Sequence, residues 1–489
     1  MKTRKFLWAL LPVAAVLLMT ACGGDDTDDV TPTPTPNPVT PGTENVVKSV
    51  PYSVTVKTAD VTRTSVSDDI TLKFEKKDKL YVQNDGGTVY GCLELKSGVG
   101  ETSATFAGTV NYTGSTPDGS TALTATLVGE GNELVTIDTD GKVQPVIYSN
   151  DYVCASMEEA VKKYSWISGK GTYGGATFTL AQNTAFMKFS VTIQDGTGPN
   201  KEVPVKITLG TDDYEFTKKT TGSQFDAHIS FVLPLADKTV IAGDASLCVA
   251  NVGSDDESIR IGTGTNVTLA GGNVYPVTRT KDFVRLSAGG PVWATKNLGA
   301  SSVTGYGNYY AWGETTGYEK SGDHNFDWSS YKYSGDTDKT LTRYNNKESY
   351  GTVDDMTTFA DYNYEDDAAY AALGASWRVP TSDEISDLAT DKTVGWITIS
   401  GISGGTVTGT GAYADKAVFL PATGRMEGTE LKLKNEAGLY WSATVNSENP
   451  SSSKCIGVDP DKDDPSKGIV STGSGGRRYG RAIRPVRMN

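Results

Sequence analysis

Hydrophobic and polar residues alternate along much of the chain between residues 45 and 281. Successive side chains of a β-strand point to opposite faces, so a period of two predicts strands with one buried face and one solvated face. Clusters of glycine, aspartate and asparagine separate the runs and predict turns. Short strands at this spacing are typical of β-sandwiches, and we expect two of them, at 45–170 and 171–281, with a boundary near Gly169–Gly175. The clearest alternating runs are 52–56, 70–74, 187–193, 203–209 and 229–235.

One helical segment interrupts these strands, the run E-E-A-V-K-K-Y-S-W at Glu158–Trp166. Ser156 and Glu159 stand three residues apart just before it. This is the spacing of a capping box, in which the two side chains satisfy backbone N–H groups that the first turn leaves free. We therefore expect a short helix that begins after Ser156.

The pattern changes from about Asp282 to the end of the chain. Six of the eight tryptophans lie in this segment. An alanine-rich run predicts a helix that ends at Gly374, and Thr381 with Glu384 predicts the capping box of a second helix. Short apolar runs elsewhere predict strands. The segment 282–489 is thus expected to be an α+β domain with many loops.

The N-terminus has the three parts of an export signal. Lys2, Arg4 and Lys5 make a positive start, and Phe6–Leu18 is apolar but too short to span a bilayer comfortably. The next residues, L-M-T-A-C, end at Cys22 and resemble a bacterial lipobox. The resemblance implies that residues 1–21 are removed and that Cys22 is acylated, which gives a lipid anchor. An ordinary secretory signal with a chance cysteine is the alternative.

Residues 22–44 read as a tether. The run G-G-D-D-T-D-D resembles the surface-export signal of Bacteroidota-type lipoproteins, and a solvated acidic linker is the plainer interpretation. Alternating threonine and proline follow at Thr31–Pro41 and favour extended polyproline II, a semi-rigid spacer. We therefore expect a protein anchored to the cell outer membrane and exposed on the cell surface.

Charge and composition argue against several function classes. The formal net charge of −14 disfavours nucleic acid, whose phosphates need a basic face. Only two histidines, His228 and His324, are present and no C-x-x-C pair occurs, so no metal site, cofactor or catalytic site is predicted. The adjacent carboxylates Asp354–Asp355 and Asp366–Asp367 read as solvated residues. The loop Asp459–Pro465 lacks the glycine and glutamate of a calcium loop and reads as a solvated insertion.

The five cysteines lead to two further expectations. Cys92, Cys154 and Cys248 leave room for one disulfide in an oxidising envelope. Cys455 stands alone in its domain within K-C-I-G-V, and we expect a buried free thiol there.

Four short motifs between residues 62 and 278 resemble the fimbrillin-like proteins. The resemblance implies a mainly β fold of two transthyretin-like β-sandwiches, export as a lipoprotein and, in many members, assembly into a pilus (fimbrium). It also implies proteolytic maturation after an arginine, for which Arg63 is the candidate, and addition of a donor strand from a neighbouring fimbrial subunit. Arg63 could equally be a solvated residue at a strand end. The motifs are Thr62–Ser65, Phe74–Val82, Ala185–Ile193 and Ala270–Thr278.

The segment 282–489 resembles the Fibrobacter succinogenes major paralogous (FISUMP) domain. That resemblance implies a C-type-lectin-like or formylglycine-generating-enzyme-like fold and a surface setting, with no defined reaction. A single cysteine, Cys455, does not suffice for oxidative copper chemistry. The motifs are V-W-A-T-K-N-L-G-A, Y-Y-A-W-G-E-T, S-W-R-V-P-T-S-D-E, F-L-P-A-T-G, L-Y-W-S-A-T and R-R-Y-G-R-A-I-R-P-V-R.

Two polar segments of this domain carry aromatic and basic residues suited to ligand binding. An aromatic ring can stack on the apolar face of a sugar, and arginine can meet an anionic glycan. Packing within the domain is the alternative for both segments. Three other tryptophans, Trp293, Trp377 and Trp441, stand in apolar runs and are expected in the core. The candidate ligand-binding residues are Trp328, Tyr331, Tyr333, Arg477, Arg478 and Tyr479.

These expectations combine into one interpretation. The chain is expected to be a cell-surface adhesin and not an enzyme, either a fimbrial tip or accessory subunit or a free-standing lipoprotein, with a glycan or a host surface protein as ligand. Because a further domain follows the fimbrillin-like region, a polymerising shaft subunit fits less well. The alternative is a glycan-capture lipoprotein that serves nutrient uptake.

Overall fold

The computed structural model describes residues 46–58, 73–249, 257–360 and 364–487. The chain divides into two units, residues 1–46 and 47–489, and every element named below belongs to the second. The expected export signal, Cys22, the tether and Arg63 lie outside the described residues. In the described part of the chain, no helix combines the length and the apolar character needed to cross a membrane.

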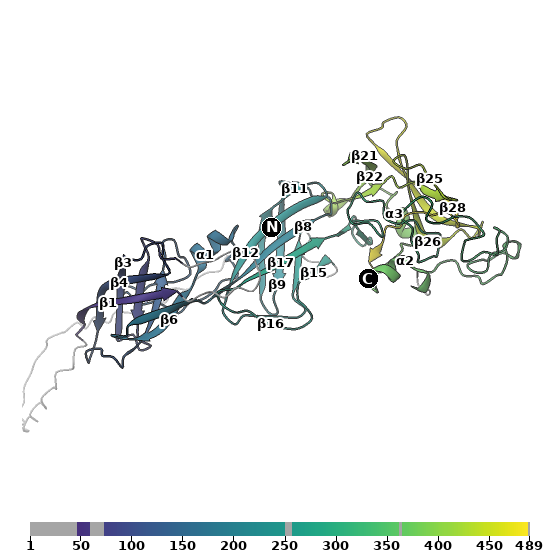
Figure 1. The fold of residues 1–489 in the computed structure, drawn as a ribbon. Coiled ribbons are helices and arrows are strands. Elements are labelled where there is room, and N and C mark those ends of the chain that lie inside the picture. The colour runs from purple at the N-terminus through teal and green to yellow at the C-terminus, as the bar shows by residue number, and fades with distance from the viewer. Residues whose placement is uncertain (1–45, 59–72, 250–256, 361–363, 488–489) are drawn as a thin grey trace, which may run out of the picture. The chain divides into compact units, whose positions relative to one another are not determined.

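The first sheet is a closed barrel of seven strands, purple to blue in Figure 1. The barrel closes because β1 pairs antiparallel with β4 on one side and parallel with β7 on the other. Alternate residues of β1, namely Tyr52, Val54 and Val56, are buried in the apolar interior. The strands, in chain order, are β1 (Lys48–Thr58), β2 (Lys79–Gln83), β3 (Val89–Ser97), β4 (Ser103–Tyr112), β5 (Ala122–Val128), β6 (Ile167–Thr172) and β7 (Thr177–Gln182).

This barrel corrects two expectations. The first domain is one sheet closed on itself, not two facing sheets, and it extends to Gln182, so a boundary at residue 170 cuts through β6. The sequence predicts a boundary near Gly169–Gly175, but Gly169 and Gly171 lie inside β6, and Gly174 and Gly175 lie in the connection between β6 and β7. A Cβ on Gly169 would overlap the Thr179 carbonyl, and one on Gly171 would overlap the Phe178 ring. Close strand packing, not chain flexibility, requires glycine here.

The expected helix forms as α1 (Met157–Tyr164). The Ser156 hydroxyl accepts a hydrogen bond from the Glu159 N–H at 3.1 Å, as predicted. The Glu159 carboxylate accepts from the Ala155 N–H at 2.8 Å instead of reaching the N-cap backbone. Only the serine half of the capping box therefore has the expected geometry.

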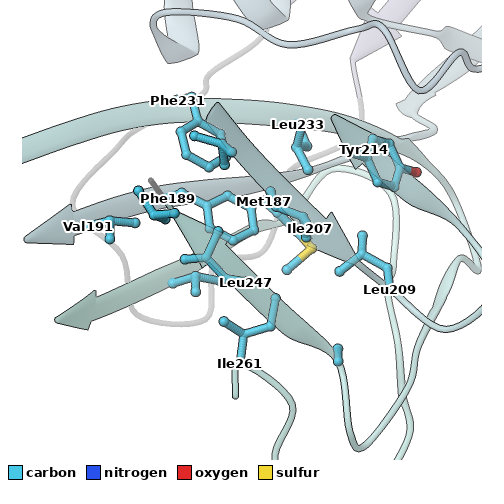
Figure 2. Packing of buried hydrophobic residues seen from close by; sticks show 14 of the residues in the cluster. Met187, Phe189, Val191, Ile207, Leu209, Tyr214, Phe231, Leu233, Leu247 and Ile261 are labelled. Atoms are coloured by element: carbon cyan, nitrogen blue, oxygen red, sulfur yellow. The ribbon is translucent and has the colours of Figure 1, made fainter. Parts of the chain in front are cut away.

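The second domain is a sandwich of two four-stranded sheets, teal in Figure 1. The expected alternation is confirmed in β8 and β12, which pair along their length and bury every second residue. Figure 2 shows the core, in which the Phe189 and Phe231 rings stack with centroids 4.7 Å apart. The sheet orders are β10-β9-β14-β15 and β11-β12-β8-β17, with a small β13-β16 pair. The strands are β8 (Thr184–Ile193), β9 (Glu202–Thr208), β10 (Asp213–Lys219), β11 (Thr221–Ser223), β12 (Asp226–Ala236), β13 (Val240–Ile241), β14 (Ser246–Val249), β15 (Ile259–Arg260), β16 (Val267–Thr268) and β17 (Val274–Lys281).

The C-terminal domain, green to yellow in Figure 1, contains several small sheets. Their orders are β18-β19-β29-β20, β21-β22-β23, β24-β25 and β26-β27-β28. The strands are β18 (Phe283–Arg285), β19 (Val292–Ala294), β20 (Trp377–Arg378), β21 (Thr393–Ile399), β22 (Ile402–Thr408), β23 (Ala417–Pro421), β24 (Arg425–Glu427), β25 (Glu430–Lys432), β26 (Gly438–Val445), β27 (Ser452–Pro460), β28 (Gly468–Gly476) and β29 (Val486–Arg487).

Short helices complete this domain. As predicted, α2 (Ala368–Leu373) ends at Gly374, whose φ of +84° favours glycine. The predicted capping box of Thr381 and Glu384 opens α3 (Ser382–Asp387). The described residues of this domain also form single turns of 3₁₀ helix at η2 (Glu348–Tyr350), η3 (Tyr364–Asp366) and η4 (Gly411–Tyr413).

Buried charges link the β-sandwich of the second domain to the C-terminal domain. Asp195, two residues after the end of β8, is fully buried, and its Oδ2 lies 2.9 Å from Lys281 Nζ and 3.6 Å from Lys416 Nζ. The Asp195 carbonyl also accepts from the N–H of Ala417, the first residue of β23, at 2.9 Å. A buried carboxylate needs such partners because it has lost its hydration. We call Asp195, Lys281 and Lys416 the junction cluster.

Candidate functional site

Three of the residues expected to bind a ligand, Trp328, Arg478 and Tyr479, lie together and are partly exposed. The guanidinium carbon of Arg478 lies 5.8 Å from the centre of the Trp328 ring and 4.2 Å from that of Tyr479. Arg478 Nη2 also donates a hydrogen bond to the Tyr479 hydroxyl at 3.0 Å. Cation–π attraction therefore orders these side chains at the surface.

Arg425 extends this arrangement. Its guanidinium carbon lies 5.0 Å from the centre of the Tyr479 ring, and its Nη2 lies 3.0 Å from the Glu427 carboxylate. The Tyr479 hydroxyl donates to the same carboxylate at 3.2 Å. Hydrogen bonding from Arg425 holds the pKa of Glu427 below its ordinary value. We call Trp328, Arg478, Tyr479 and Arg425 the arginine–aromatic ladder.

Sequence reasoning missed Arg425 because its position depends on contacts between distant segments. It begins β24, which forms a hairpin with β25, and the chain reverses at Gly428 with φ +60°. The run R-M-E-G-T-E-L-K could have indicated that hairpin, since one glycine separates two short alternating segments. Nothing local shows that the hairpin contacts the segment around Tyr479.

The ladder lies on buried aromatic residues. Tyr331 is buried and meets the Trp328 ring edge-on, with centroids 5.8 Å apart. Its hydroxyl donates to the Trp312 carbonyl at 2.8 Å. Because these rings are fixed by packing, Trp328 has a firm support and a ligand would meet a surface already in place.

Burial removes three expected residues from the candidate surface. Tyr331, Tyr333 and Arg477 are 3%, 5% and 0% exposed, so they belong to the core. Arg477 and Arg478 occupy the middle of a turn that the Tyr479 N–H closes by bonding to the Gly476 carbonyl at 3.0 Å. Neighbouring residues in this turn point in different directions, so one arginine is buried and the other is exposed.

Each guanidinium nitrogen of the buried Arg477 is hydrogen-bonded within the domain. Its Nε donates to the Tyr331 hydroxyl at 2.8 Å, and its other nitrogens donate at 3.1 Å to backbone carbonyls. The guanidinium carbon lies 4.7 Å from the centre of the Trp312 ring. These contacts show a structural role: Arg477 ties separate loops together.

The paired carboxylates at Asp366–Asp367 are buried, which corrects the expectation that they are solvated. Asp366 accepts hydrogen bonds from the Tyr333 and Tyr344 hydroxyls and from Lys332. Burial raises the pKa of Asp366, but these hydrogen bonds outweigh it, and the pKa lies below its ordinary value. Asp367 caps α2 by accepting from two backbone N–H groups. Both carboxylates therefore stabilise the loops around α2.

Asp354 has a similar structural role. Its carboxylate accepts from the N–H groups of Tyr344 at 2.8 Å and Asn345 at 2.9 Å. In the loop Asp459–Pro465, Asp461 and Asp464 accept hydrogen bonds from N–H groups two residues further along. Among the described residues, no group of three or more His, Cys, Asp or Glu side chains is placed to hold a metal ion.

The cysteines and tryptophans follow the sequence expectations in part. Cys455 is a buried free thiol, as predicted, and the possible disulfide among Cys92, Cys154 and Cys248 is not formed in the described part of the chain. Trp293 and Trp441 are buried. Trp377 is not: it is partly exposed, with the Arg487 guanidinium carbon 5.3 Å from its ring centre. It lies in β20, an edge strand of its sheet.

Comparison with known proteins gives similarities at low identity. No family model and no curated protein matches the chain. Among solved structures, the chain is similar to a proposed cell adhesion protein from Bacteroides ovatus, at 14% identity and a TM-score of 0.25, covering 48% of this chain and 92% of the other. It is also similar to the fimbrial anchor protein Mfa2 from Porphyromonas gingivalis, at 11% identity and a TM-score of 0.23, covering 41% and 78%.

Proposed function

We propose that the chain is a surface-exposed outer-membrane lipoprotein that acts as an adhesin, as a fimbrial tip or accessory subunit, and that its C-terminal domain binds the ligand. The observation that carries the proposal is the arginine–aromatic ladder. It offers partly exposed aromatic faces beside guanidinium groups, on a support of buried rings. Such a surface suits a sugar, whose ring stacks on an aromatic face while its polar groups meet arginine.

The N-terminal sequence supports attachment to the cell surface. The lipobox-like run ending at Cys22 is followed by an acidic, proline-rich tether. An acyl chain contributes about 0.8 kcal/mol for each buried CH₂, so more than one chain anchors a protein stably. The extended tether would hold the folded domains away from the membrane.

The first strand supports a role as a fimbrial subunit. β1 lies between β4 and β7, and Arg63 follows it in the sequence. During assembly, cleavage after Arg63 would release the chain from its Cys22 anchor, and loss of β1 would uncover two strand edges and the apolar positions that Tyr52, Val54 and Val56 fill. An extended strand from another subunit could then take the place of β1.

Two substitutions test this account of the N-terminal segment in cells. Cys22→Ala is expected to prevent acylation and to leave the protein out of the outer-membrane fraction. Arg63→Ala is expected to keep β1 attached and to prevent incorporation into high-molecular-weight assemblies. Fractionation, immunoblotting and mass spectrometry of the mature N-terminus measure both. A mature wild-type chain that begins at acylated Cys22 and still enters assemblies would refute strand replacement, and a membrane-bound Cys22→Ala chain would refute the anchor.

Ligand binding is tested at Trp328. Trp328→Ala removes the outer ring of the ladder and is expected to weaken binding by about 1–3 kcal/mol, the range for losing a large apolar contact. Stability should fall by about 1 kcal/mol or less, because the side chain is only partly buried. Binding to arrays of glycans and host surface proteins, together with thermal unfolding, measures both effects.

Trp377→Ala is the matched control, since Trp377 is also partly exposed and also lies beside an arginine, Arg487. It belongs to β20 and lies outside the ladder, so binding should be unchanged. If Trp328→Ala lowers stability strongly and leaves every binding signal intact, the ladder is packing and the proposed site is wrong.

A further inference from the structure

Arg425 of the ladder lies opposite a buried arginine, Arg481. Met426 and Gly480 form an antiparallel bridge, with N–H to carbonyl distances of 2.8 and 3.1 Å. This register sets Arg425 opposite Arg481 and Glu427 opposite Tyr479. All four side chains therefore leave the same face of the bridge, since neighbours of a bridged residue point away from it. Like charges directly opposite each other destabilise a strand pair, so this placement costs stability.

Neighbouring groups do not fully pair the guanidinium groups of Arg425 and Arg481. Arg481 is 5% exposed, and its Nε and Nη1 have no hydrogen-bond partner; neither has the buried Nε of Arg425. Within the described residues, Glu427 is the carboxylate paired with Arg425, and none is paired with Arg481. Buried N–H groups of a cation are expensive to leave unpaired, because they have lost water and gained nothing in return.

The surroundings of Arg481 are built to hold a guanidinium. Its guanidinium carbon lies 4.6 Å from the centre of the Trp441 ring. A Cβ on Gly475 would overlap the guanidinium, so only glycine leaves room for it there. Burial lowers the pKa of Arg481, and the charge of Arg425 adds to that effect. The domain thus keeps a positive charge where charge is costly, next to a partly exposed surface.

We propose that Arg425, Arg478 and Arg481 form an anion site and that the ligand of the ladder is an acidic sugar. Its carboxylate or sulfate would meet the outer guanidinium groups of Arg425 and Arg478, with Arg481 adding buried charge below them. Its ring would stack on Trp328 or Tyr479. This inference rests on the proposed function and adds the chemical class of the ligand.

An acidic sugar fits these residues better than an acidic peptide. Guanidinium groups bind planar carboxylates and sulfates through paired N–H donors. An acidic peptide would use the same donors but has no flat apolar ring for the two partly exposed aromatics. The ladder places guanidinium donors and partly exposed aromatic rings in one set of contacting side chains.

Matched oligosaccharide pairs that differ only in charge test the inference on the mature chain. The probes are sialyllactose against lactose, oligogalacturonate against its methyl ester, and sulfated against desulfated glycosaminoglycan oligosaccharides; polyglutamate represents acidic peptides. Isothermal titration is expected to show at least one acidic sugar binding about tenfold or more tightly than its neutral counterpart, as expected for hydrogen bonds to a charged group. That affinity should fall as salt is added.

Substitution of the arginines tests whether they cause the difference in affinity between acidic and neutral sugars. Arg425→Gln and Arg478→Gln are each expected to remove most of the difference between acidic and neutral members. Arg487→Gln is the control, because it removes the same charge from a partly exposed arginine that stacks on Trp377, outside the ladder. If a variant fails to fold, the salt titration of the unaltered chain still tests the role of charge.

The possible results separate this inference from the proposed function. Equal binding of acidic and neutral sugars, still sensitive to Trp328→Ala, would overturn the anion site and leave the adhesin proposal standing. Tight binding of polyglutamate with no oligosaccharide bound would overturn the assignment to sugars. No oligosaccharide binding at all would also overturn the inference, and the adhesin proposal would then depend on the Trp328→Ala result with host proteins.

Discussion

Asp195→Asn is expected to destabilise the C-terminal half of the chain by about 3–5 kcal/mol, the cost of removing one partner from a buried ion pair. The substitution keeps the shape of the side chain but removes the carboxylate that Lys281 and Lys416 share. Lys281 then keeps the more distant Glu257, at 3.8 Å, and Lys416 keeps the exposed Asp415. Chemical denaturation followed by tryptophan fluorescence measures the change, since six of the eight tryptophans lie in 282–489.

Asp415→Asn is the matched control for this prediction. Asp415 also pairs with Lys416, at 3.0 Å, but its side chain is 54% exposed. Water screens such a pair, and its loss should cost about 1 kcal/mol or less. Equal, small effects of the two substitutions would show that the junction cluster contributes little to stability.

The junction cluster should also make stability depend on pH. Burial by itself raises the pKa of Asp195, but Lys281 and Lys416 outweigh it and lower the pKa to about 2, from an ordinary value of 3.8. A carboxyl with a depressed folded-state pKa stabilises the fold above its unfolded pKa. We therefore expect this stabilisation to be complete above about pH 4 and to disappear as the pH falls toward 2. Asp195→Asn should lose less stability over that interval than the unaltered chain.

Trp441→Ala is expected to destabilise the C-terminal domain by about 3–5 kcal/mol, the usual cost of the cavity left by a large aromatic residue. The indole is 1% exposed, and its Nε1 donates to the Tyr310 carbonyl at 2.9 Å. It also covers the Arg481 guanidinium. The substitution therefore removes apolar packing, a hydrogen bond and the ring beside a buried charge. Thermal and chemical unfolding measure the loss.

Two further substitutions give smaller expected losses of stability for comparison with Trp441→Ala. Trp441→Phe keeps much of the ring and loses the N–H, so it should cost clearly less than Trp441→Ala. Trp377→Ala removes a partly exposed indole and should cost less again. If Trp377→Ala proves as destabilising as Trp441→Ala, burial does not govern the contribution of tryptophan in this domain.

The sequence by itself determined the local structure of much of the chain. Alternation correctly identified β8 and β12, because side-chain direction in a strand depends only on the parity of the position. Thr381 with Glu384 and the stop at Gly374 were also predictable, since capping chemistry acts within one helical turn. The same holds for the burial of Trp441 and Cys455 in apolar runs.

Only the tertiary structure decided which segments meet. The closed barrel requires β1 to pair with β7, more than a hundred residues later. Nothing local indicates this pairing, and the glycines of β6 therefore suggested a domain boundary inside the barrel.

The candidate site also depends on contacts between distant segments. Arg477 and Arg478 are neighbours of identical chemistry, yet a turn sends one into the core and the other to the surface. Arg425 joins Tyr479 and Arg481 through one antiparallel bridge. Periodicity and capping act over a few residues, whereas strand pairing and turn orientation depend on the packing of the whole domain. That packing determined which of the expected ligand-binding residues lie at the surface.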